Sequence, residues 1–318
     1  MTYRPATIDD AELASDLMSA SYVALPQDPL LTRYRWKHPR KDMKSGRFIG
    51  EIDGRPAAFL SWYHGPWEKL PDRHCEVEVW LHPAHLDRAL LRTMFTWIGD
   101  RAVADGAGLL LAYCAEDEPE MLDSLSDLGY SRERIEKVWE LDLRVQGPKL
   151  VEAARVELDK MAAVGVELTT LDAWSDPDKM RKVYELDAST RQDIPTSLPI
   201  LIEDLEDFVK RTKAPDRRND RTWVALDDGR PVALSYLKFP PVRGTVWTGY
   251  TCTHADHRGR GIARAVKLQT LAQAARLRVP HVRTDNDAEN APMLHINEAL
   301  GYVRRPGFVE HHKRVTSK

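Results

Sequence analysis

Hydrophobic and polar residues alternate along this chain in segments that switch between the period of a strand and the period of a helix. In the first half, helical spacing predicts helices at residues 9–18 and 86–104. Apolar runs predict strands at residues 48–63, 76–81, 108–115 and 138–143. The first of these runs turns at Asp53-Gly54, which predicts a hairpin.

The second half shows the same kind of alternation after Gln146-Gly147-Pro148, which we expect to break the pattern. Apolar residues at helical spacing from Leu150 to Met161 predict a linking helix, and a new series of elements begins near Val166. Further elements are predicted at residues 223–226, 231–239, 245–253 and 281–284 (strands) and from Ile262 (a helix). The charged, proline-rich segment 187–219 interrupts this order, and such loops commonly carry specificity.

Three short landmarks occur twice at nearly one offset, which indicates an internal repeat. Two of them, His82-Pro83-Ala84-His85 and Leu128-Gly129-Tyr130, return 172 residues later as His254-Ala255-Asp256-His257 and Leu300-Gly301-Tyr302. The third, Gly54-Arg55-Pro56, returns 175 residues later as Gly229-Arg230-Pro231. We therefore expect two copies of one α/β domain, at residues 1–147 and 148–318.

Composition and charge limit the class of protein. A length of 318 residues suits about two domains, each with its own core. A formal net charge of −3 gives no electrostatic reason to expect nucleic acid or an anionic membrane as a partner. Neither a membrane span nor a signal peptide is predicted, so the cytoplasm is the expected compartment. The three cysteines are far apart and suggest neither disulfides nor a metal site.

The stretch from His257 to Ala263 carries the clearest chemistry, because two glycines between arginines open a helix directly after a strand. Such a turn aims free backbone N–H groups and the positive end of the helix dipole at one point. The predicted anion site comprises Arg258, Gly259, Arg260, Gly261, Ile262 and Ala263. A turn that only caps the helix is the alternative. A dinucleotide fingerprint would need glycine or alanine at Arg264, and no P-loop sequence is present.

Taken in order, this loop, two asparagines downstream and the final Leu300-Gly301-Tyr302 resemble the GNAT family of acyl-CoA N-acyltransferases. Arg258, Gly261 and Ala263 have the spacing of that family's pyrophosphate loop. The resemblance implies two tandem GNAT-like domains of the α/β class, each with a mixed, mostly antiparallel sheet flanked by helices. It also implies acetyl-CoA as the acyl donor.

The downstream asparagines are the other residues that the resemblance assigns to the cofactor: Asn286, Asn290 and Asn297. Asn290 is equally suited to cap a helix that starts near Pro292. Asn297 stands where the family commonly has a tyrosine that protonates the departing thiolate, and asparagine cannot act as a general acid. The proton must then come from water or another residue, unless a thiolate with a pKa of about 8.5 leaves unaided.

The implied chemistry is direct attack of an amine on a thioester, with backbone N–H groups stabilising the oxyanion. Cys252 and Thr253 are the candidate backbone donors. No carboxylate occurs in residues 245–253, so Tyr250 and His254 are the candidate groups that handle the amine's proton. Packing of Tyr250 in the sheet and a surface position for His254 are the alternatives.

Substrate binding is expected at Tyr250 and at Asp193, where a loop carboxylate would suit a cationic substrate. An acid that is merely exposed is the alternative for Asp193. In the first copy, Leu86, Asp87 and Ala89 replace the loop residues, so side chains and a negative charge block the anion's approach. We expect that copy to be non-catalytic.

These observations predict an acyl-CoA-dependent N-acyltransferase that acetylates a primary amine of a small molecule in a ternary complex. A protein-lysine acetyltransferase is the alternative enzyme, and a non-catalytic acyl-CoA sensor or scaffold is the alternative outside catalysis. The expected partner is a small-molecule amine, with neither nucleic acid nor membrane. A homodimer is left open.

Overall fold

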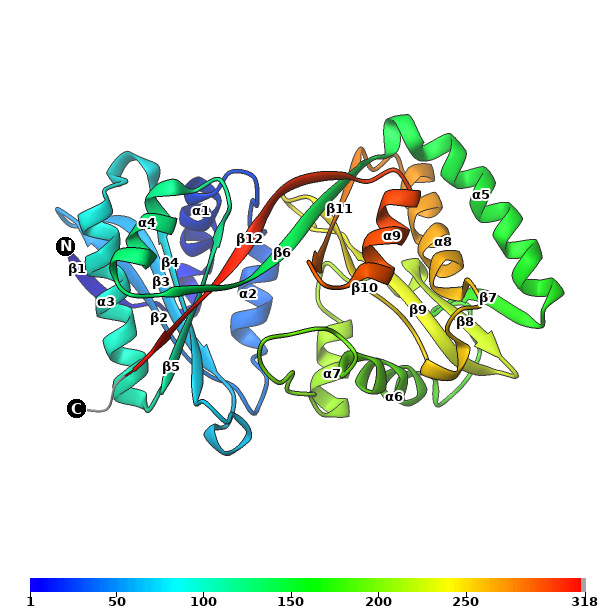
Figure 1. Ribbon diagram of the computed structural model, residues 1–318, viewed down its shortest axis with the longest axis horizontal. Helices are drawn as coiled ribbons and strands as arrows, with labels where there is room; N and C mark the ends of the chain where they lie inside the picture. Colours follow the sequence, from blue (N-terminus) through cyan, green and yellow to red (C-terminus); the bar gives the residue numbers. More distant parts are fainter. Residues whose placement is uncertain (316–318) are drawn as a thin grey trace. The chain divides into compact units, whose positions relative to one another are not determined.

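The computed structural model describes residues 1–315, which contacts divide into two compact units (Figure 1). The first unit comprises residues 1–136, residues 241–244 and residues 306–315. The second unit comprises residues 137–240 and 245–305. In each unit helices cover both faces of a mixed, mostly antiparallel sheet, which confirms the predicted α/β class.

The first unit contains β1 (Thr2–Pro5), α1 (Ala11–Ser21), α2 (Pro29–Lys37), β2 (Lys44–Ile52), β3 (Arg55–His64), β4 (His74–Leu81), α3 (Arg88–Asp105), β5 (Leu109–Ala115), α4 (Pro119–Asp127) and most of β12 (Val303–Arg314). Its strands lie in the order β1-β2-β3-β4-β5-β12. Only the β4–β5 pair is parallel. The main core lies between the sheet and α3 with α4, and a smaller cluster lies under α1 on the other face.

The second unit contains the end of β6 (Ser131–Asp142), α5 (Leu143–Ala163), β7 (Val166–Thr170), α6 (Lys179–Arg191), α7 (Leu205–Thr212), β8 (Thr222–Asp227), β9 (Arg230–Lys238), β10 (Val246–Thr253), α8 (Ile262–Arg276), β11 (His281–Asp287) and α9 (Ala291–Ala299). Its strands lie in the order β6-β11-β10-β9-β8-β7. Helices α5 and α8 pack on one face, and α6 and α7 pack on the other (Figure 1).

The two copies exchange their last strands. By order along the chain, β6 ends the first copy and β12 ends the second. β12 nevertheless pairs with β5 of the first copy, where Val309 lies opposite Cys114. The end of β6 lies beside β11 of the second copy, where Glu140 accepts a hydrogen bond from Arg283 over 2.7 Å. Each sheet is therefore completed by a strand that belongs to the other copy.

Helix α5 differs from the expected linking helix because it runs through Gln146-Gly147-Pro148 without a break. Pro148 removes one hydrogen bond from the helix, but close packing on α8 offsets that loss. At Gly147 the two helices approach so closely that an added Cβ would lie 3.1 Å from the Cβ of Ala275. The boundary expected between residues 147 and 148 therefore falls inside a helix.

No helix among residues 1–315 combines the length and the apolar character needed to cross a bilayer.

Gly307 of β12 provides a test of the strand exchange. An added Cβ at this position would lie 2.2 Å from the carbonyl oxygen of Glu136, and backbone cannot move aside cheaply. We expect Gly307→Ala to lower the free energy of unfolding by about 1–3 kcal/mol, measured by urea denaturation. Val303→Ala, at a side chain that is 60% exposed on the same strand, should leave it unchanged. Equal urea midpoints for both variants would contradict this placement of β12.

Candidate functional site

Strands β10 and β11 part shortly after they meet. Their parallel pairing covers only two positions, Val246 with Val282 and Trp247 with Arg283. Beyond this point residues 248–253 and 284–287 have no ladder partner across the gap. Backbone polar groups that line such a gap are available to a ligand.

A β-bulge in β10 between Thr248 and Tyr250 lies next to the gap. The bulge contains Gly249, whose missing side chain leaves room for the ring of Tyr236 on β9. An added Cβ at Gly249 would lie 1.9 Å from Cε2 of that ring. The bulge and the tyrosine thus fit together on the face covered by α6 and α7.

The direction of the backbone in β10 corrects one predicted oxyanion donor. The amide of His254 donates to the carbonyl of Val232 over 2.8 Å, so it points toward β9. Amides alternate in direction along an antiparallel strand, so the amide of Cys252 also points toward β9. Those of Thr251 and Thr253 point toward the gap. Thr253 therefore keeps its predicted place, and Thr251 is a donor that the sequence did not single out.

The loop before α8 leaves backbone amides without partners. Gly259 and Gly261 have φ angles of 75° and 78°, which glycine adopts without strain, and nothing lies within 4 Å of either missing Cβ. Gly261 provides no side-chain cap for α8. The amides of residues 259–264 have no backbone acceptor within residues 1–315. Ile262 and Ala263 open the helix, so these amides lie in the segment predicted to bind an anion, and that binding stays a prediction.

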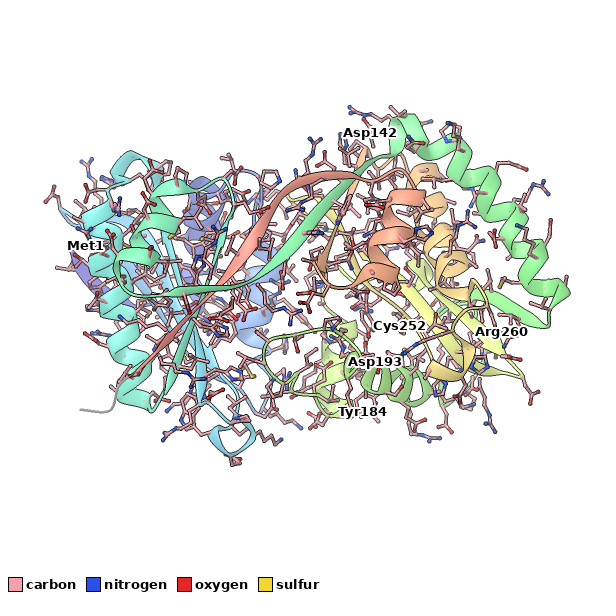
Figure 2. All side chains as sticks on the ribbon, in the orientation of Figure 1. Met1, Asp142, Tyr184, Asp193, Cys252 and Arg260 are labelled. Carbon is pink, nitrogen blue, oxygen red and sulfur yellow. The ribbon has the colours of Figure 1, made fainter. Side chains whose placement is uncertain are left out.

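The charged side chains of the loop are paired with acids. Arg258 pairs with Asp193, which follows α6 (Figure 2). Arg258 also donates to the carbonyl of Thr253 over 3.2 Å. Arg260 and His257 both contact Asp227, at 3.2 Å each. Asp193, predicted to attract a cationic substrate, is thus engaged with the loop. An anion at this site would be held mainly by backbone amides.

A buried polar chain joins α8, α9 and β11. Lys267 of α8 is fully buried and its Nζ donates to Oδ1 of Asn297 over 2.6 Å. Asn297 is also fully buried, and its Nδ2 donates to Oδ1 of Asn286 over 2.6 Å. Burial lowers the pKa of Lys267 to about 7, against an opposing effect of Asp285. The side-chain oxygen and nitrogen of Asn297 are therefore both hydrogen-bonded within the protein.

Asn290 caps α9, which was the alternative to its role in cofactor binding. Its Oδ1 accepts a hydrogen bond from the amide of Met293 over 3.4 Å. This contact satisfies one of the free amides at the start of α9.

The two predicted proton carriers lie in different surroundings. Tyr250 is half-buried against α6, donates to Oγ1 of Thr190 over 3.2 Å, and has its pKa raised by burial. A raised pKa disfavours Tyr250 as a base. His254 is partly exposed and accepts a hydrogen bond from the amide of Asp256, which caps the short turn Ala255–His257. His82 makes the same contact with Ala84 in the first copy. Tyr250 therefore fits the alternative of packing in the sheet, and His254 fits the alternative of a surface position.

The matching helix of the first unit lacks a free N-terminus. Asp87 precedes α3, and its carboxylate accepts a hydrogen bond from the amide of Leu90 over 2.8 Å. That carboxylate occupies the end of the helix where an anion would otherwise bind, and it would also repel one.

Residues 180–302 match the model of the Acetyltransferase (GNAT) family. Residues 180–302 therefore form a GNAT acetyltransferase domain. The GNAT family transfers acyl groups from acyl-CoA, and the matched residues include the loop at residues 258–263. No curated relative matches the sequence.

The fold of the whole chain, including the unit outside the GNAT match, is shared with solved structures. A tandem GNAT protein from the clavulanic acid biosynthesis pathway is 18% identical, with a TM-score of 0.75, over 100% of this chain and 99% of that one. A GCN5-related N-acetyltransferase from Sphaerobacter thermophilus is 17% identical, with a TM-score of 0.68, over 99% and 96% of the two chains. At this identity the likeness establishes the tandem fold alone.

Lys267 should make stability depend on pH. Its pKa is about 7 in the folded protein and about 10.4 in an unfolded chain, so the unfolded state binds more protons between these values. Stability should therefore rise with pH in this window, by up to about 1.4 kcal/mol per pH unit from this group. Urea denaturation of the wild type and Lys267→Met at several pH values measures the effect. Parallel curves for the two proteins would contradict the lowered pKa.

Proposed function

We propose that the protein transfers the acetyl group of acetyl-CoA to a primary amine of a small molecule, by direct attack in a ternary complex. The observation that carries this proposal is the run of unpaired amides at residues 259–264, next to the gap between β10 and β11. A pyrophosphate at the loop would accept hydrogen bonds from these amides, and the pantetheine arm would follow the gap. Acetyl-CoA is here a substrate that the second unit alone binds.

The oxyanion and the leaving group would need no special side chain in the gap. The amides of Thr251 and Thr253 point into it and would donate to the oxyanion that forms when nitrogen attacks the thioester carbonyl. The amine would approach from the face covered by α6 and α7, where the bulge at Gly249 interrupts the ladder. The departing thiolate is a tolerable leaving group because its conjugate thiol has a pKa of about 8.5.

The first unit contributes no second site in this proposal. Asp87 accepts a hydrogen bond from the amide of Leu90 and places a negative charge at the start of the helix that corresponds to α8, so we expect no anion to bind there. In the first unit β5 pairs with β12, and we propose that this unit serves to stabilise the fold.

Binding of acetyl-CoA should be lost in Gly261→Asp. The new side chain would strain a backbone at φ 78° and place a negative charge where the pyrophosphate approaches. Gly229→Asp is the matched control, because Gly229 has φ 68°, nothing within 4 Å of its missing Cβ, and lies in the β8–β9 turn. Calorimetry should give one site per chain for the wild type and the control, and none for Gly261→Asp.

Two results would contradict the proposal. Unchanged affinity in a folded Gly261→Asp would mean that the loop only caps α8, and two equal sites would mean that the first unit also binds. Turnover with a panel of small amines separates an enzyme from the alternative of an acyl-CoA sensor, which would bind without transfer. Acetylation of lysine peptides in preference to that panel would favour the alternative acceptor class.

A further inference from the structure

Tyr236 lies on the face of the sheet covered by α6 and α7, from which the amine is proposed to approach. It is not among the residues singled out from the sequence. It is only 3% exposed, and it pairs across the ladder with Tyr250. Its ring fills the space left by Gly249, so the phenol lies beside the bulge of β10.

Two arginines contact the phenol directly. Nη1 of Arg211 donates to the hydroxyl oxygen over 3.3 Å. The guanidinium carbon of Arg217 lies 3.3 Å from the centroid of the ring. Nε of Arg217 is buried and has no hydrogen-bond acceptor among residues 1–315. One cation therefore bonds the oxygen, and a second stacks on the ring without a partner for its buried Nε.

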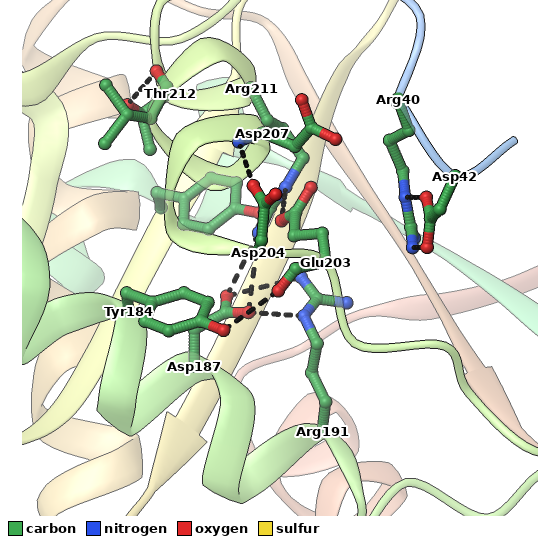
Figure 3. A network of polar contacts seen from close by, with 12 residues as sticks. Arg40, Asp42, Tyr184, Asp187, Arg191, Glu203, Asp204, Asp207, Arg211 and Thr212 are labelled. Carbon is green, nitrogen blue, oxygen red and sulfur yellow. Dashed lines mark hydrogen bonds and ion pairs between the residues drawn. The ribbon is translucent and has the colours of Figure 1, made fainter.

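The carboxylates nearby are engaged with the other cations (Figure 3). Asp187 accepts from Arg191 over 2.5 Å and from Arg211 over 3.4 Å. Glu203 accepts from Arg211 over 2.6 Å. Counted by element, the charged groups around the phenol are Asp187 and Arg191 on α6, Glu203 before α7, Arg211 on α7, Asp216 and Arg217 after α7, and Lys238 on β9. A further carboxyl, that of Asp285 on β11, interacts electrostatically with Lys238.

Burial alone would raise the pKa of Tyr236, but Arg217, Arg211, Lys238 and Arg191 together bring this pKa below its usual value. Its neighbour Tyr250 shows the reverse, because burial dominates there and raises the pKa. The difference follows from the number of nearby cations, since Arg217, Arg211, Lys238 and Arg191 all lower the pKa of Tyr236, whereas Arg191, which lies over its ring, is the cation that acts on Tyr250.

We propose that Tyr236 is the base of this reaction, ionised as a phenolate between Arg211 and Arg217. The assignment rests on the proposed function. As the amine nitrogen attacks, the C–N bond forms and an N–H proton moves to the phenolate oxygen. The C–S bond then breaks, and the thiolate leaves and takes a proton from solvent. The phenol returns its proton to solvent, so the net products are an amide and free CoA thiol.

Ultraviolet titration of the ligand-free protein tests the phenolate without reference to turnover. Tyrosinate absorbs differently from tyrosine, and we expect one tyrosine of the wild type to ionise below the usual pKa of about 10. Tyr236→Phe should lose this step, and Tyr250→Phe should retain it. Arg217→Gln should move the step to higher pH, because it removes a cation from the ring. A step that survives in Tyr236→Phe, or that does not move in Arg217→Gln, would overturn the proposal.

The pH dependence of kcat/KM tests the role as base. Tyr236→Phe should lower kcat about a hundredfold or more and remove the acidic limb, after allowance for the amine's own titration. Its affinity for acetyl-CoA, measured by calorimetry, should not change. A Tyr236→Phe variant that keeps the wild-type rate and the acidic limb would overturn the assignment.

The two experiments fail separately. A wild type that binds acetyl-CoA yet acetylates no amine would overturn the proposed function and with it the role of Tyr236 as base. The titration would in that case still report whether the phenol is ionised. A loss of acetyl-CoA binding in Tyr236→Phe would instead show that the residue shapes the site, and would overturn its role as base.

Discussion

The separation of β10 from β11 is the constraint on which the rest of the second unit depends. Strands that part after two paired positions leave backbone groups without partners, and those groups must find others or stay open to a ligand. The bulge at Gly249 keeps the ladder to β9 while its neighbour strand diverges, and Tyr236 fills the space that results. The site is thus made mostly of exposed main chain, and the side chains around it set its charge.

The two copies differ at the start of the helix that follows the capped turn. The first unit keeps a parallel pair that is also short, between β4 and β5, and the same capped turn before the helix. It differs at the helix itself, where Asp87 satisfies an amide that Gly261 leaves free. A side chain that accepts a hydrogen bond from an amide of its own helix leaves fewer amides at the helix N-terminus for an anion. Conversely, His254 has a counterpart in His82, which argues that its contact serves the turn rather than the chemistry.

Local signals account for what the sequence predicted well. The hairpin turns, the strand before the loop and the start of α8 at Ile262 depend on neighbours in the chain, and the repeat is visible because these landmarks recur. Helix α5 runs through Gly147 because packing on α8 overrides the local break. The pair between Arg258 and Asp193 joins residues 65 positions apart, so no local pattern indicates it.

Other features of the site needed the register of strands and the packing of helices. The direction of the amide of Cys252 follows only from the ladder with β9. Lys267 lies on a helix that is buried on nearly every side, so the apolar stripe does not mark it as unusual. Tyr236 reads as an ordinary residue of a buried strand, and the arginines that surround it come from elements that only the fold brings together.

The exchange of last strands has a consequence for how the chain is made. A ribosome delivers the first copy early, and domains generally fold in that order. Here β5 meets β12 only after the elements of the second unit, which precede β12 in the chain, have been translated. Until then β5 presents an unpaired edge, which is a template for pairing with other nascent chains. The sheet of the first unit is therefore completed last. A first unit that has folded completely shows that the second unit has already been synthesised.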